Sequence, residues 1–491
     1  YSFGLKRGGE NISGGNTMCF KELEENFKDH CGIFGIYCPD GKLDVAKITY
    51  FGLYALQHRG QESSGIAVND AGNIIYHKDN GLVNEVFNEV VLNHLKGYSA
   101  IGHVRYSTTG KSDRENAQPL VIKYRKGHMA LAHNGNLVNA HIIREKLEQE
   151  GAIFQTTIDS EVIASLISRN RIKSENIEEA ILKTMNEIKG AYSLLILTPN
   201  KLIAVRDPYG LRPLVMGKIN NSICFASETC ALDTIGAEYI RDVEPGEIIS
   251  VSRNGIKSIK YENGTKHLCV FEFIYFARAD SYLEGISVYE IRKRLGKQLC
   301  KESYVDCDIV IGVPDSGTTA AIGFAEEAGI PFSEGFIKNR YIGRTFIKPE
   351  QTQREIAVKI KLNVLKSNVA GKRVVLIDDS IVRGTTSRKI IKMLRDAGAS
   401  EVHLRISSPP VVFPCYYGID TPDRKELIAA NYSTEEIARI LGADSLEYLS
   451  LNGLNEVFEG RIHQFCTACF SGEYVTEIPE NFNKYILEEG V

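Results

Sequence analysis

The sequence predicts two fold classes in one chain, an α+β domain followed by an α/β domain with a mostly parallel sheet. Over roughly residues 31–265, short strand patterns are followed by helical segments and then by more strands, an order typical of a layered α+β domain. After Lys266, strands and helices alternate, which favours a parallel sheet with crossover helices. The 491 residues are enough for two or three domains. We therefore expect domains at 31–265 and 266–491, packed closely because no linker-like stretch separates them.

Composition excludes several classes of protein. The net charge of −4 and the 24% of charged residues do not indicate a partner nucleic acid or a membrane surface. No apolar run approaches the length of a membrane-spanning helix. Residues 1–17 lack the apolar core of a secretory signal. The 11 cysteines are scattered along a long chain, which predicts reduced thiols and a cytoplasmic location.

In the first half, an apolar strand with glycines begins at Cys31, and residues 43–57 have a helical pattern. Further strands are expected at 64–68, 74–77, 99–104 and 129–133, then helices at 138–150, 160–168 and 177–189, then strands between 191 and 226. This order supports a layered domain.

In the second half, residues 308–313 predict a strand that ends in Pro314-Asp-Ser-Gly-Thr-Thr319. An alanine-rich helix to Glu327 follows, and residues 330–336 are expected to return as a strand, completing a βαβ unit. Residues 374–377 and 402–406 continue the alternation.

The segment 374–386 carries the strongest chemical signal. Four apolar residues are followed by Asp378 and Asp379, a turn with Gly384, and a hydroxyl-rich start of an amphipathic helix. Backbone N–H groups at such a helix start bind phosphate, and the carboxylates can bind ribose hydroxyls or a hard cation. An Asp-Asp pair alone would more often be a surface feature of an ordinary βα turn. The 314–319 loop also leads from the end of a strand to the start of a helix, and its N–H groups can bind a pyrophosphate.

The whole 374–386 segment resembles the signature of type I phosphoribosyltransferases, which bind phosphoribosyl pyrophosphate (PRPP). The resemblance implies that the 314–319 loop binds pyrophosphate and the 374–386 loop binds the 5-phosphate. It implies one Mg²⁺ per subunit near Ser316, Asp378 and Asp379. The implied PRPP-binding residues are Asp315, Ser316, Gly317, Thr318, Lys338, Tyr341, Asp378, Asp379, Ser380, Arg383, Gly384, Thr385 and Thr386.

The basic, glycine-containing segment 338–345 lies between the two phosphate loops in the sequence. By itself such a segment would be interpreted as a solvated surface loop. Its position favours a lid that closes over PRPP and adds positive charge.

Five ordered segments in the first half resemble the class II glutamine amidotransferases, which have an N-terminal-nucleophile fold, an αββα sandwich. They are Cys31-Gly-Ile-Phe-Gly-Ile, Leu56-Gln-His-Arg-Gly-Gln-Glu62, Gly102-His-Val-Arg-Tyr-Ser-Thr108, Ala132-His-Asn-Gly-Asn136 and Thr156-Thr-Ile-Asp-Ser160. Cysteine needs a base to become a good nucleophile. A free α-amine on Cys31 can serve, so residues 1–30 are expected to be a leader and propeptide that is removed.

The same resemblance assigns the other glutaminase residues. Asn134 and Gly135 are expected to form the oxyanion hole, and Arg105, Thr108 and Asp159 to bind glutamine. Arg59 and Tyr275 are expected to sense PRPP and close the glutamine site. His58, His103 and His133 are expected to be structural.

Four cysteines form a further candidate site. Cys466-Thr-Ala-Cys469 is a CxxC motif, which can be a redox pair, a zinc site or part of an iron–sulfur site. With Cys269 and Cys415 it resembles the ligand set of the iron–sulfur-containing branch of the amidophosphoribosyltransferases. That resemblance implies one [4Fe–4S] cluster per subunit, with a structural role, in a branch that also carries a propeptide. Zinc stays open on ligand type alone.

Together the two halves resemble the amidophosphoribosyltransferase family over roughly residues 31–475. The family implies that Cys31 releases ammonia from glutamine and that the ammonia passes internally to PRPP, giving 5-phosphoribosylamine, pyrophosphate and glutamate. This is the first committed step of purine synthesis. The resemblance also implies a homotetramer and feedback inhibition by AMP, ADP and GMP.

Two rival functions are weighed against this one. Other class II amidotransferases carry a sugar isomerase or an ATP-pyrophosphatase domain, which the 374–386 segment argues against. A PRPP-binding regulator without catalysis would not need Cys31, Asn134 and Asp159.

Overall fold

The structure is a computed structural model that describes residues 31–106, 113–261, 264–339, 362–419, 421, 423–479 and 487. The predicted leader 1–30, Thr108, Tyr341 and the lid residues 340–345 lie outside the described residues.

Two antiparallel sheets form the first half of the chain. The seven-stranded sheet has the order β11-β9-β10-β1-β4-β2-β3, and the six-stranded sheet has the order β13-β12-β8-β7-β6-β5. The strands are β1 (Gly32–Tyr37), β2 (Ser63–Asp70), β3 (Asn73–Asn80), β4 (Ser99–Arg105), β5 (Leu120–Tyr124), β6 (Gly127–Leu137), β7 (Gly190–Leu197), β8 (Leu202–Arg206), β9 (Val215–Ile219), β10 (Ser222–Ala226), β11 (Glu238–Asp242), β12 (Glu247–Ser252) and β13 (Gly255–Lys260).

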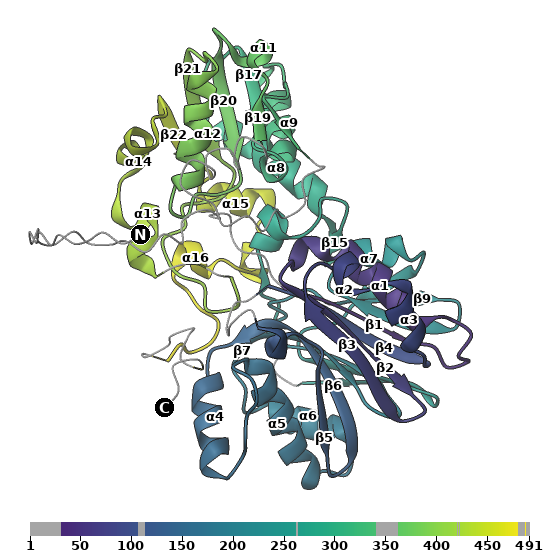
Figure 1. Cartoon of the computed structure of the whole chain (residues 1–491). Helices are drawn as coiled ribbons and strands as arrows, with labels where there is room; N and C mark the ends of the chain where they lie inside the picture. Colours follow the sequence, from purple (N-terminus) through teal and green to yellow (C-terminus); the bar gives the residue numbers. More distant parts are fainter. Residues whose placement is uncertain are drawn as a thin grey trace, which may run out of the picture.

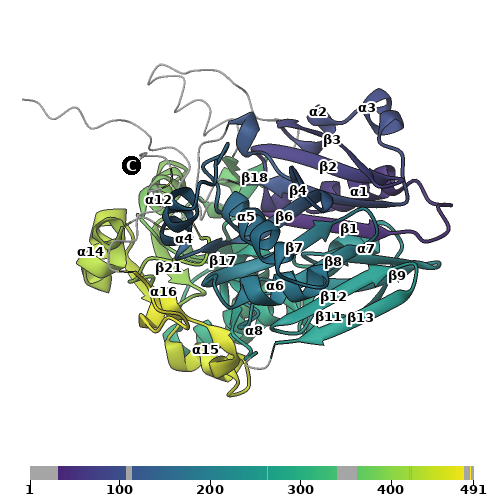
Figure 2. The same cartoon turned by 90° about the horizontal axis from the view of Figure 1, so that it is seen from below.

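Helices cover the outer face of each sheet (Figures 1 and 2). The first layer contains α1 (Val45–Ala55), α2 (Val83–Val86), α3 (Glu89–His94) and α7 (Thr229–Thr234), and the other contains α4 (Ala140–Gln149), α5 (Asp159–Ile172) and α6 (Ile177–Met185). Three apolar clusters separate the four layers, with the middle one, around Ile33 and Leu195, between the sheets. The predicted αββα sandwich is therefore confirmed.

Close packing of α1 on the first sheet fixes the start of β1. Asp44 caps α1 by accepting a hydrogen bond from the Lys47 N–H. A Cβ on Gly52 would lie 2.5 Å from the ring of Phe34, so only glycine lets the helix lie this close to the strand. The strand that follows Cys31 is therefore packed directly against α1.

The second half contains the predicted parallel sheet, with the order β17-β20-β21-β22 and every neighbouring pair parallel. Its elements are β14 (Leu268–Cys269), the π-helical turn Glu272–Phe276, β15 (Tyr282–Leu283), β16 (Ile286–Ser287), α8 (Val288–Ser303), β17 (Ile309–Gly312), α9 (Ser316–Ala328), β18 (Phe336–Lys338), β19 (Leu362–Val364), α11 (Lys366–Val369), β20 (Arg373–Asp378), α12 (Thr385–Asp396), β21 (Glu401–Ile406), α13 (Ile428–Asn431), α14 (Thr434–Leu441), β22 (Ser445–Tyr448), α15 (Leu451–Val457), β23 (Phe465–Cys466) and α16 (Ala468–Ser471). The α/β class of this half is confirmed.

The backbones of helices α8 and α9 approach each other closely at two glycines. A Cβ on Gly296 would lie 1.8 Å from the Ala320 carbonyl oxygen, and one on Gly323 would lie 2.0 Å from that of Lys293. The backbones of the two helices are therefore in direct contact, and larger residues at either glycine would separate them.

One predicted strand is wrong in its extent. Residues 330–336 make a single parallel bridge, Val310 with Phe332, and strand β18 begins only at Phe336, where it pairs antiparallel with β19. Pro331 has no N–H to donate, so the segment runs beside β17 without a regular ladder. The helix predicted after Thr319 begins earlier, at Ser316, so most of the expected loop forms its first turn.

The two halves contact each other through the C-terminal segment. β14 pairs in parallel with β23, and α15 and α16 lie between the sandwich and the parallel sheet in Figure 1. Asn136 donates to the Tyr416 carbonyl at 2.9 Å, and Arg212 donates to that of Tyr417 at 2.6 Å. The predicted close packing of the halves is observed, whereas the exact boundary at 265 stays a prediction.

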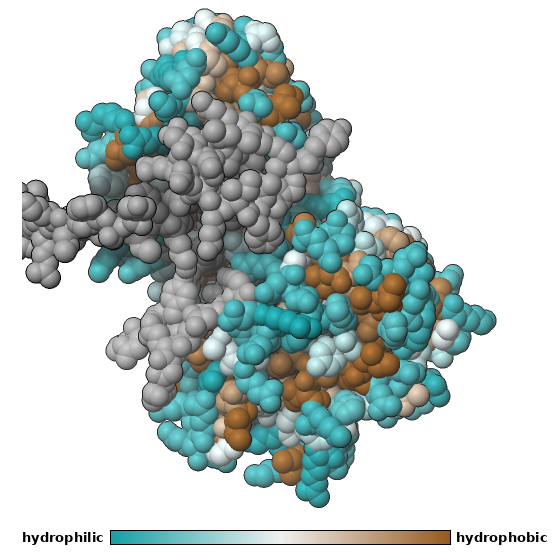
Figure 3. Space-filling model, in the orientation of Figure 1, coloured by the Kyte–Doolittle hydropathy of each residue, from teal (hydrophilic) through white to brown (hydrophobic). Residues whose placement is uncertain are grey.

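Hydrophilic residues cover much of the described surface on the face in Figure 3, with hydrophobic residues in separate groups. Among the described helices, none is both long and apolar enough to cross a membrane.

Candidate active sites

The first candidate site is built around Cys31. The residue is only 7% exposed, and its Sγ donates to the Tyr106 carbonyl at 3.5 Å. Burial raises the pKa of the Cys31 thiol, the positive charge of Arg105 lowers it, and Asp159 and Glu62 raise it. The net pKa is raised, so the thiol needs a base before it can attack a substrate.

Asn134 and Gly135 lie on β6 of the six-stranded sheet, whereas Cys31 precedes β1 of the seven-stranded sheet. The Asn134 side chain is 0% exposed, and neither its Nδ2 nor its Oδ1 has a hydrogen-bond partner in the described protein. Gly135 has φ +149°, and a Cβ there would lie 2.0 Å from the Ala191 carbonyl oxygen. An unpaired buried amide carries a cost in folding free energy, which is expected where the amide serves a ligand.

Asp159 begins α5 and is buried beside His133 and β6. Its Oδ2 accepts from the Leu137 N–H at 3.0 Å, and its Oδ1 lies 3.4 Å from His133 Nδ1. Burial acts to raise the pKa of Asp159, but His133 and the hydrogen bonds outweigh it, so the pKa is lowered and the group is an anion at neutral pH. Arg105, at the end of β4, is also buried.

The histidines have structural contacts. His103 Nε2 lies 3.0 Å from the His133 carbonyl oxygen, and burial lowers the pKa of His103 to about 3, so it is neutral at pH 7. His58 Nε2 lies 2.8 Å from Glu228 Oε1. Each of these histidines therefore has a hydrogen-bond partner in the protein, and their structural role stays a prediction.

Arg59 connects the first site with the second half of the chain. The side chain is 1% exposed, and its Nε donates to the Cys31 carbonyl at 3.2 Å. Its terminal nitrogens donate to Glu228 at 2.6 Å and to both carboxylate oxygens of Glu272 at 2.8 and 2.9 Å. Burial acts to lower the pKa of Arg59, but Glu272 and Glu228 raise it well above its usual value, so the guanidinium stays charged.

Sequence reasoning missed Glu228 and Glu272, which lie 169 and 213 residues from Arg59 along the chain. No local pattern marks either residue. Tyr275, the predicted partner of Arg59, lies in the same π-helical turn as Glu272 and is partly buried.

The second candidate site lies where β20 ends. Asp378 and Asp379 are 7% and 6% exposed, and Ser316, at the start of α9, donates to Asp379 Oδ1 at 2.6 Å. Ser380 donates to Asp379 Oδ2 at 2.6 Å. The two loops that the sequence predicted to act together therefore meet at Asp379.

Burial and the neighbouring Asp379 raise the pKa of Asp378 well above its usual range. Two buried carboxylates in contact resist simultaneous ionisation. Such a pair is suited to bind a cation or ribose hydroxyls, either of which reduces the repulsion between the charges.

The other predicted PRPP residues that the structure describes lie in or next to α9, β18 and α12. A Cβ on Gly317 would lie 2.4 Å from the Ile377 carbonyl oxygen, and Thr318 follows Gly317 in α9. Lys338 forms an exposed ion pair with Asp315 at 2.7 Å. Gly384 has φ +82° and precedes α12, whose first turn contains Thr385 and Thr386; Arg383 forms an exposed ion pair with Glu426 at 2.6 Å.

Three segments bring the four predicted cluster cysteines into one region of the structure. The β14–β23 pair aligns Cys269 with Cys466, and the Cys469 carbonyl accepts hydrogen bonds from the N–H groups of residues 412 and 413, near Cys415. Burial raises the pKa of the Cys269, Cys466 and Cys469 thiols, and the nearby cysteines add to the effect at Cys469.

All ten cysteines in the described part of the chain are free thiols. In that same part, no three histidine, cysteine or acidic side chains are arranged closely enough to form a metal site. Arg212 lies beside this group: the Leu211 carbonyl accepts from the Cys269 N–H, and the Arg212 Nε is buried without a hydrogen-bond partner. Four thiols beside a buried cation fit an anionic thiolate-bound group by donor chemistry.

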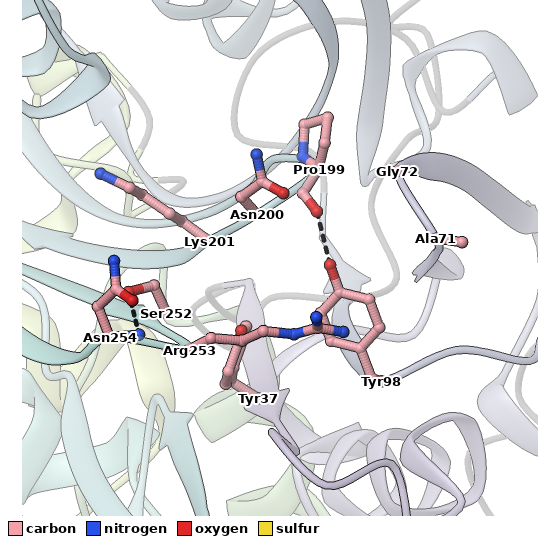
Figure 4. A pocket seen from close by; sticks show the side chains of 10 residues that line it. All are labelled: Tyr37, Ala71, Gly72, Tyr98, Pro199, Asn200, Lys201, Ser252, Arg253 and Asn254. Atoms are coloured by element: carbon pink, nitrogen blue, oxygen red, sulfur yellow. Dashed lines mark hydrogen bonds between the residues drawn. The ribbon is translucent and has the colours of Figure 1, made fainter.

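A cavity of about 490 Å³ lies at the opposite end of the sandwich, beside Tyr37 at the end of β1. Figure 4 shows Arg253 beside the Tyr98 ring, 5.6 Å from its centroid, and the Tyr98 hydroxyl bonded to the Pro199 carbonyl. Because β1 starts at Gly32, the cavity is a strand length away from Cys31. None of the predicted site residues lines it.

Each half of the chain matches a known domain family. Residues 103–234 match the glutamine amidotransferase domain, and residues 281–407 match the phosphoribosyl transferase domain. Each matched range contains one candidate site in whole or in part.

Curated relatives match along nearly the whole chain. The amidophosphoribosyltransferase of Methanocaldococcus jannaschii is 53% identical over 475 residues, which cover 94% of this chain and 100% of the relative. That of Bacillus subtilis is 49% identical over 460 residues, covering 92% and 96%.

Solved structures agree. The glutamine PRPP amidotransferase from B. subtilis, complexed with ADP and GMP, superposes with a TM-score of 0.87 at 49% identity and covers 92% of this chain and 99% of that one. A structure described as the allosteric regulatory enzyme of purine biosynthesis has a TM-score of 0.88 at 49% identity, covering 94% and 99%.

Proposed function

The chain belongs to the amidophosphoribosyltransferases, and from this membership we propose which of its residues carry out each part of the reaction. The enzymes of this family couple glutamine hydrolysis to the transfer of ammonia to PRPP, the first step of purine biosynthesis. The proposal rests mainly on one observation: the Asn134 amide is 0% exposed, and neither of its polar atoms has a hydrogen-bond partner in the described structure. Burial of an unpaired amide is costly, so it indicates that the amide serves a ligand. The buried Arg105 and Asp159 supply a cation and an anion, which suit the two charges of an amino acid substrate.

Cys31 is the proposed nucleophile, and its own α-amine the base. Because burial raises the pKa of the thiol, a base is required, and an α-amine has an ordinary pKa of about 7.7–8.0. In the chain as written, this nitrogen is the amide of the His30–Cys31 peptide bond. Removal of residues 1–30 is therefore part of the proposal. The amine takes the thiol proton, and the thiolate attacks the glutamine amide carbon.

Asn134 Nδ2 and the Gly135 N–H are the proposed donors to the oxyanion that forms in this attack. The unpaired Asn134 amide supports this role, since a donor free of protein partners is available to the substrate. Gly135 has no room for a Cβ, which supports a close backbone approach.

Arg105 is proposed to bind the glutamine carboxylate and Asp159 its ammonium group. The lowered pKa of Asp159 supports this role, because the carboxylate is charged at neutral pH. Thr108 is proposed to line the same pocket. Ammonia released here passes inside the protein to the second site, where it displaces pyrophosphate at C1 of PRPP.

The loops 315–318 and 378–386 are the proposed PRPP site, with Lys338 and Tyr341 closing over it. The N–H groups at the start of α9 and α12 suit pyrophosphate and 5-phosphate, while Asp378 and Asp379 suit the ribose hydroxyls. Ser316, Asp378 and Asp379 would also hold Mg²⁺, which prefers oxygen ligands and substrate phosphates. When bound, Mg²⁺ would neutralise charge on the leaving pyrophosphate.

Cys269, Cys415, Cys466 and Cys469 would hold a [4Fe–4S] cluster. Four free thiols on three segments, with buried Arg212 beside them, support an anionic thiolate-bound group. When bound, the cluster would link the domain junction to the C-terminal segment.

Regulation, assembly and location complete the proposal. The B. subtilis structure contains ADP and GMP, which supports inhibition of this enzyme by purine nucleotides that share the 5-phosphoribose group with PRPP. A homotetramer and a cytoplasmic location are also proposed. Ultracentrifugation and cell fractionation test these two.

Intact mass and activity of the Cys31→Ala variant test the central proposal. The active protein should have a mass that starts at Cys31. The variant should lose glutamine-dependent synthesis of phosphoribosylamine and keep ammonia-dependent synthesis, because the PRPP site is in the other domain. Retention of glutamine-dependent activity would show that Cys31 is not the nucleophile.

A further inference from the structure

The cavity beside Tyr37 is enclosed by turns from both sheets of the sandwich (Figure 4). The β2–β3 turn and the residue before β4 belong to the seven-stranded sheet, whereas the β7–β8 and β12–β13 turns belong to the six-stranded sheet. Its volume of about 490 Å³ lies within the range of roughly 300–1,000 Å³ that is usual for small-molecule sites. The cavity is therefore large enough for a ligand of metabolite size.

Asn69, on β2, joins three walls of this cavity to one another. Its side chain is 0% exposed. The Asn69 Nδ2 donates to the Tyr98 hydroxyl at 3.0 Å and to the Pro199 carbonyl at 2.8 Å, and its Oδ1 accepts from the Gly72 N–H at 2.9 Å. The Tyr98 hydroxyl donates to the same Pro199 carbonyl at 2.6 Å. Because these bonds connect turns of both sheets, the cavity has its shape before a ligand binds.

The charges in the lining are positive. Lys201 and Arg253 line the cavity, and no acidic residue does. Lys201 is paired with Glu178, which is not part of the lining. In the described part of the chain Arg253 has no carboxylate partner, and its guanidinium lies over the Tyr98 ring, 5.6 Å from the centroid. The charge of Arg253 is therefore available to an anion.

Tyr37 is the most deeply buried residue of the lining, with 1% of its surface exposed. Its ring meets the Tyr98 ring edge-on, with the centroids 5.7 Å apart. The Tyr37 hydroxyl has no hydrogen-bond partner among the described residues. A buried hydroxyl without a partner carries a cost in folding free energy, which a ligand at the inner end of the cavity would remove.

We propose that this cavity is a binding site for a small anion that carries phosphate or carboxylate groups. Arg253 makes the main ionic contact, because its planar guanidinium suits both groups. Lys201 supplies a second positive charge from another turn, and the Tyr37 hydroxyl donates to the ligand group that enters deepest. A cation would meet two like charges here, and an apolar ligand would bury these donors without partners.

A tryptophan placed at the cavity is the reporter for the test, because the chain contains no other tryptophan. Asn254→Trp is suitable, since Asn254 is exposed and uses its backbone N–H, not its side chain, to bond Ser252. The fluorescence of this variant is titrated with pyrophosphate and with citrate, in the absence of PRPP. We expect a saturable change with a midpoint below about 1 mM, the upper end of ordinary substrate affinities. A response to pyrophosphate alone would identify a phosphate ligand, and a response to citrate alone a carboxylate ligand.

Arg253→Gln, made in the reporter protein, should raise the midpoint at least about tenfold, because it removes hydrogen bonds to a charged group. Arg125→Gln is the matched control. Arg125 is an exposed arginine in the β5–β6 turn at the same end of the sandwich, and it does not line the cavity. The control should keep the midpoint within about twofold.

The proposal would be overturned if neither anion gave a saturable change at up to about 1 mM. Equal midpoints with and without Arg253→Gln would also overturn it, because the anion would then be bound elsewhere, for example at the proposed PRPP loops. If Asn254→Trp does not fold, Asn200→Trp on the β7–β8 turn is the reporter. Where both variants fold, their midpoints should agree within about twofold, since one ligand contacts both turns, and a larger difference would contradict a single site.

Discussion

Replacement of Asn134 by leucine should destroy glutamine hydrolysis and at the same time stabilise the protein. Asn134 is 0% exposed, and both polar atoms of its amide lack partners in the described structure. Leucine has a similar shape and no polar atoms, so it removes the cost of burying an unpaired amide. In most catalytic-residue substitutions, by contrast, activity and stability are expected to fall together.

The expected change in stability and the expected loss of activity come from two different physical effects. A buried polar group without a partner costs about 1–3 kcal/mol, so Asn134→Leu should raise the free energy of unfolding by roughly that amount. Loss of one oxyanion donor costs about 2.7–4 kcal/mol in the transition state, which corresponds to a decrease in kcat of about 10²–10³-fold.

Glutaminase rate, ammonia-dependent synthesis and the denaturant midpoint of unfolding are the three measurements. Asn136→Leu is the control on the same strand, because the Asn136 amide donates to the Tyr416 carbonyl at 2.9 Å. Its loss should destabilise the protein by about 0.5–1.5 kcal/mol. An Asn134→Leu variant that is destabilised, or that keeps kcat within about threefold, would refute the reasoning, because the amide would then be bonded in the folded protein or idle in catalysis.

Three further outcomes are expected. The pKa of Asp378 is raised in the folded protein, so the unfolded chain loses this proton at a lower pH and the stability of the fold decreases as the pH rises above about 4. Asp378→Asn should therefore be more stable than the unmodified protein at pH 7. Urea midpoints of both proteins at pH 4 and pH 7 test this, and a stability difference between them that does not grow with pH would contradict it. Cys469→Ser should lose bound iron, sulfide and visible absorbance, whereas Cys300→Ser, a buried cysteine outside the proposed ligand set, should keep them; equal metal content in both variants would argue against the cluster. Gly317→Ala should abolish synthesis with either nitrogen source but leave basal glutaminase intact, since a Cβ there would lie 2.4 Å from a carbonyl oxygen of β20; normal synthesis with ammonia would show that the loop tolerates the change.

The chemistry-bearing loops could be predicted because their residues are adjacent in the sequence. A buried strand, an acidic pair and a hydroxyl-rich helix start occur within residues 374–386, and each type has a local physical reason to be there. The order of strands and helices in the first half likewise indicates its layered α+β class. The structure confirms both fold classes.

Local patterns failed where neighbours in space decide the outcome. Residues 330–336 contain three large apolar residues and were expected to form a strand, but Pro331 cannot donate to a ladder and the segment makes one bridge. The short helices α2, α3 and α7 and the strands β11 to β13 carried too little periodicity to be predicted individually. Packing against the sheets stabilises such segments more than their own sequences do.

The sequence by itself determined the fold classes of the two halves and indicated the candidate site residues, because turn, cap and phosphate-binding requirements act over a few adjacent positions. Only the tertiary structure decided which distant charges are neighbours. Arg59 and Glu272 are 213 residues apart and yet share two hydrogen bonds. A buried charge must find a partner, but the partner can come from any segment that the fold brings near, so no local pattern identifies it.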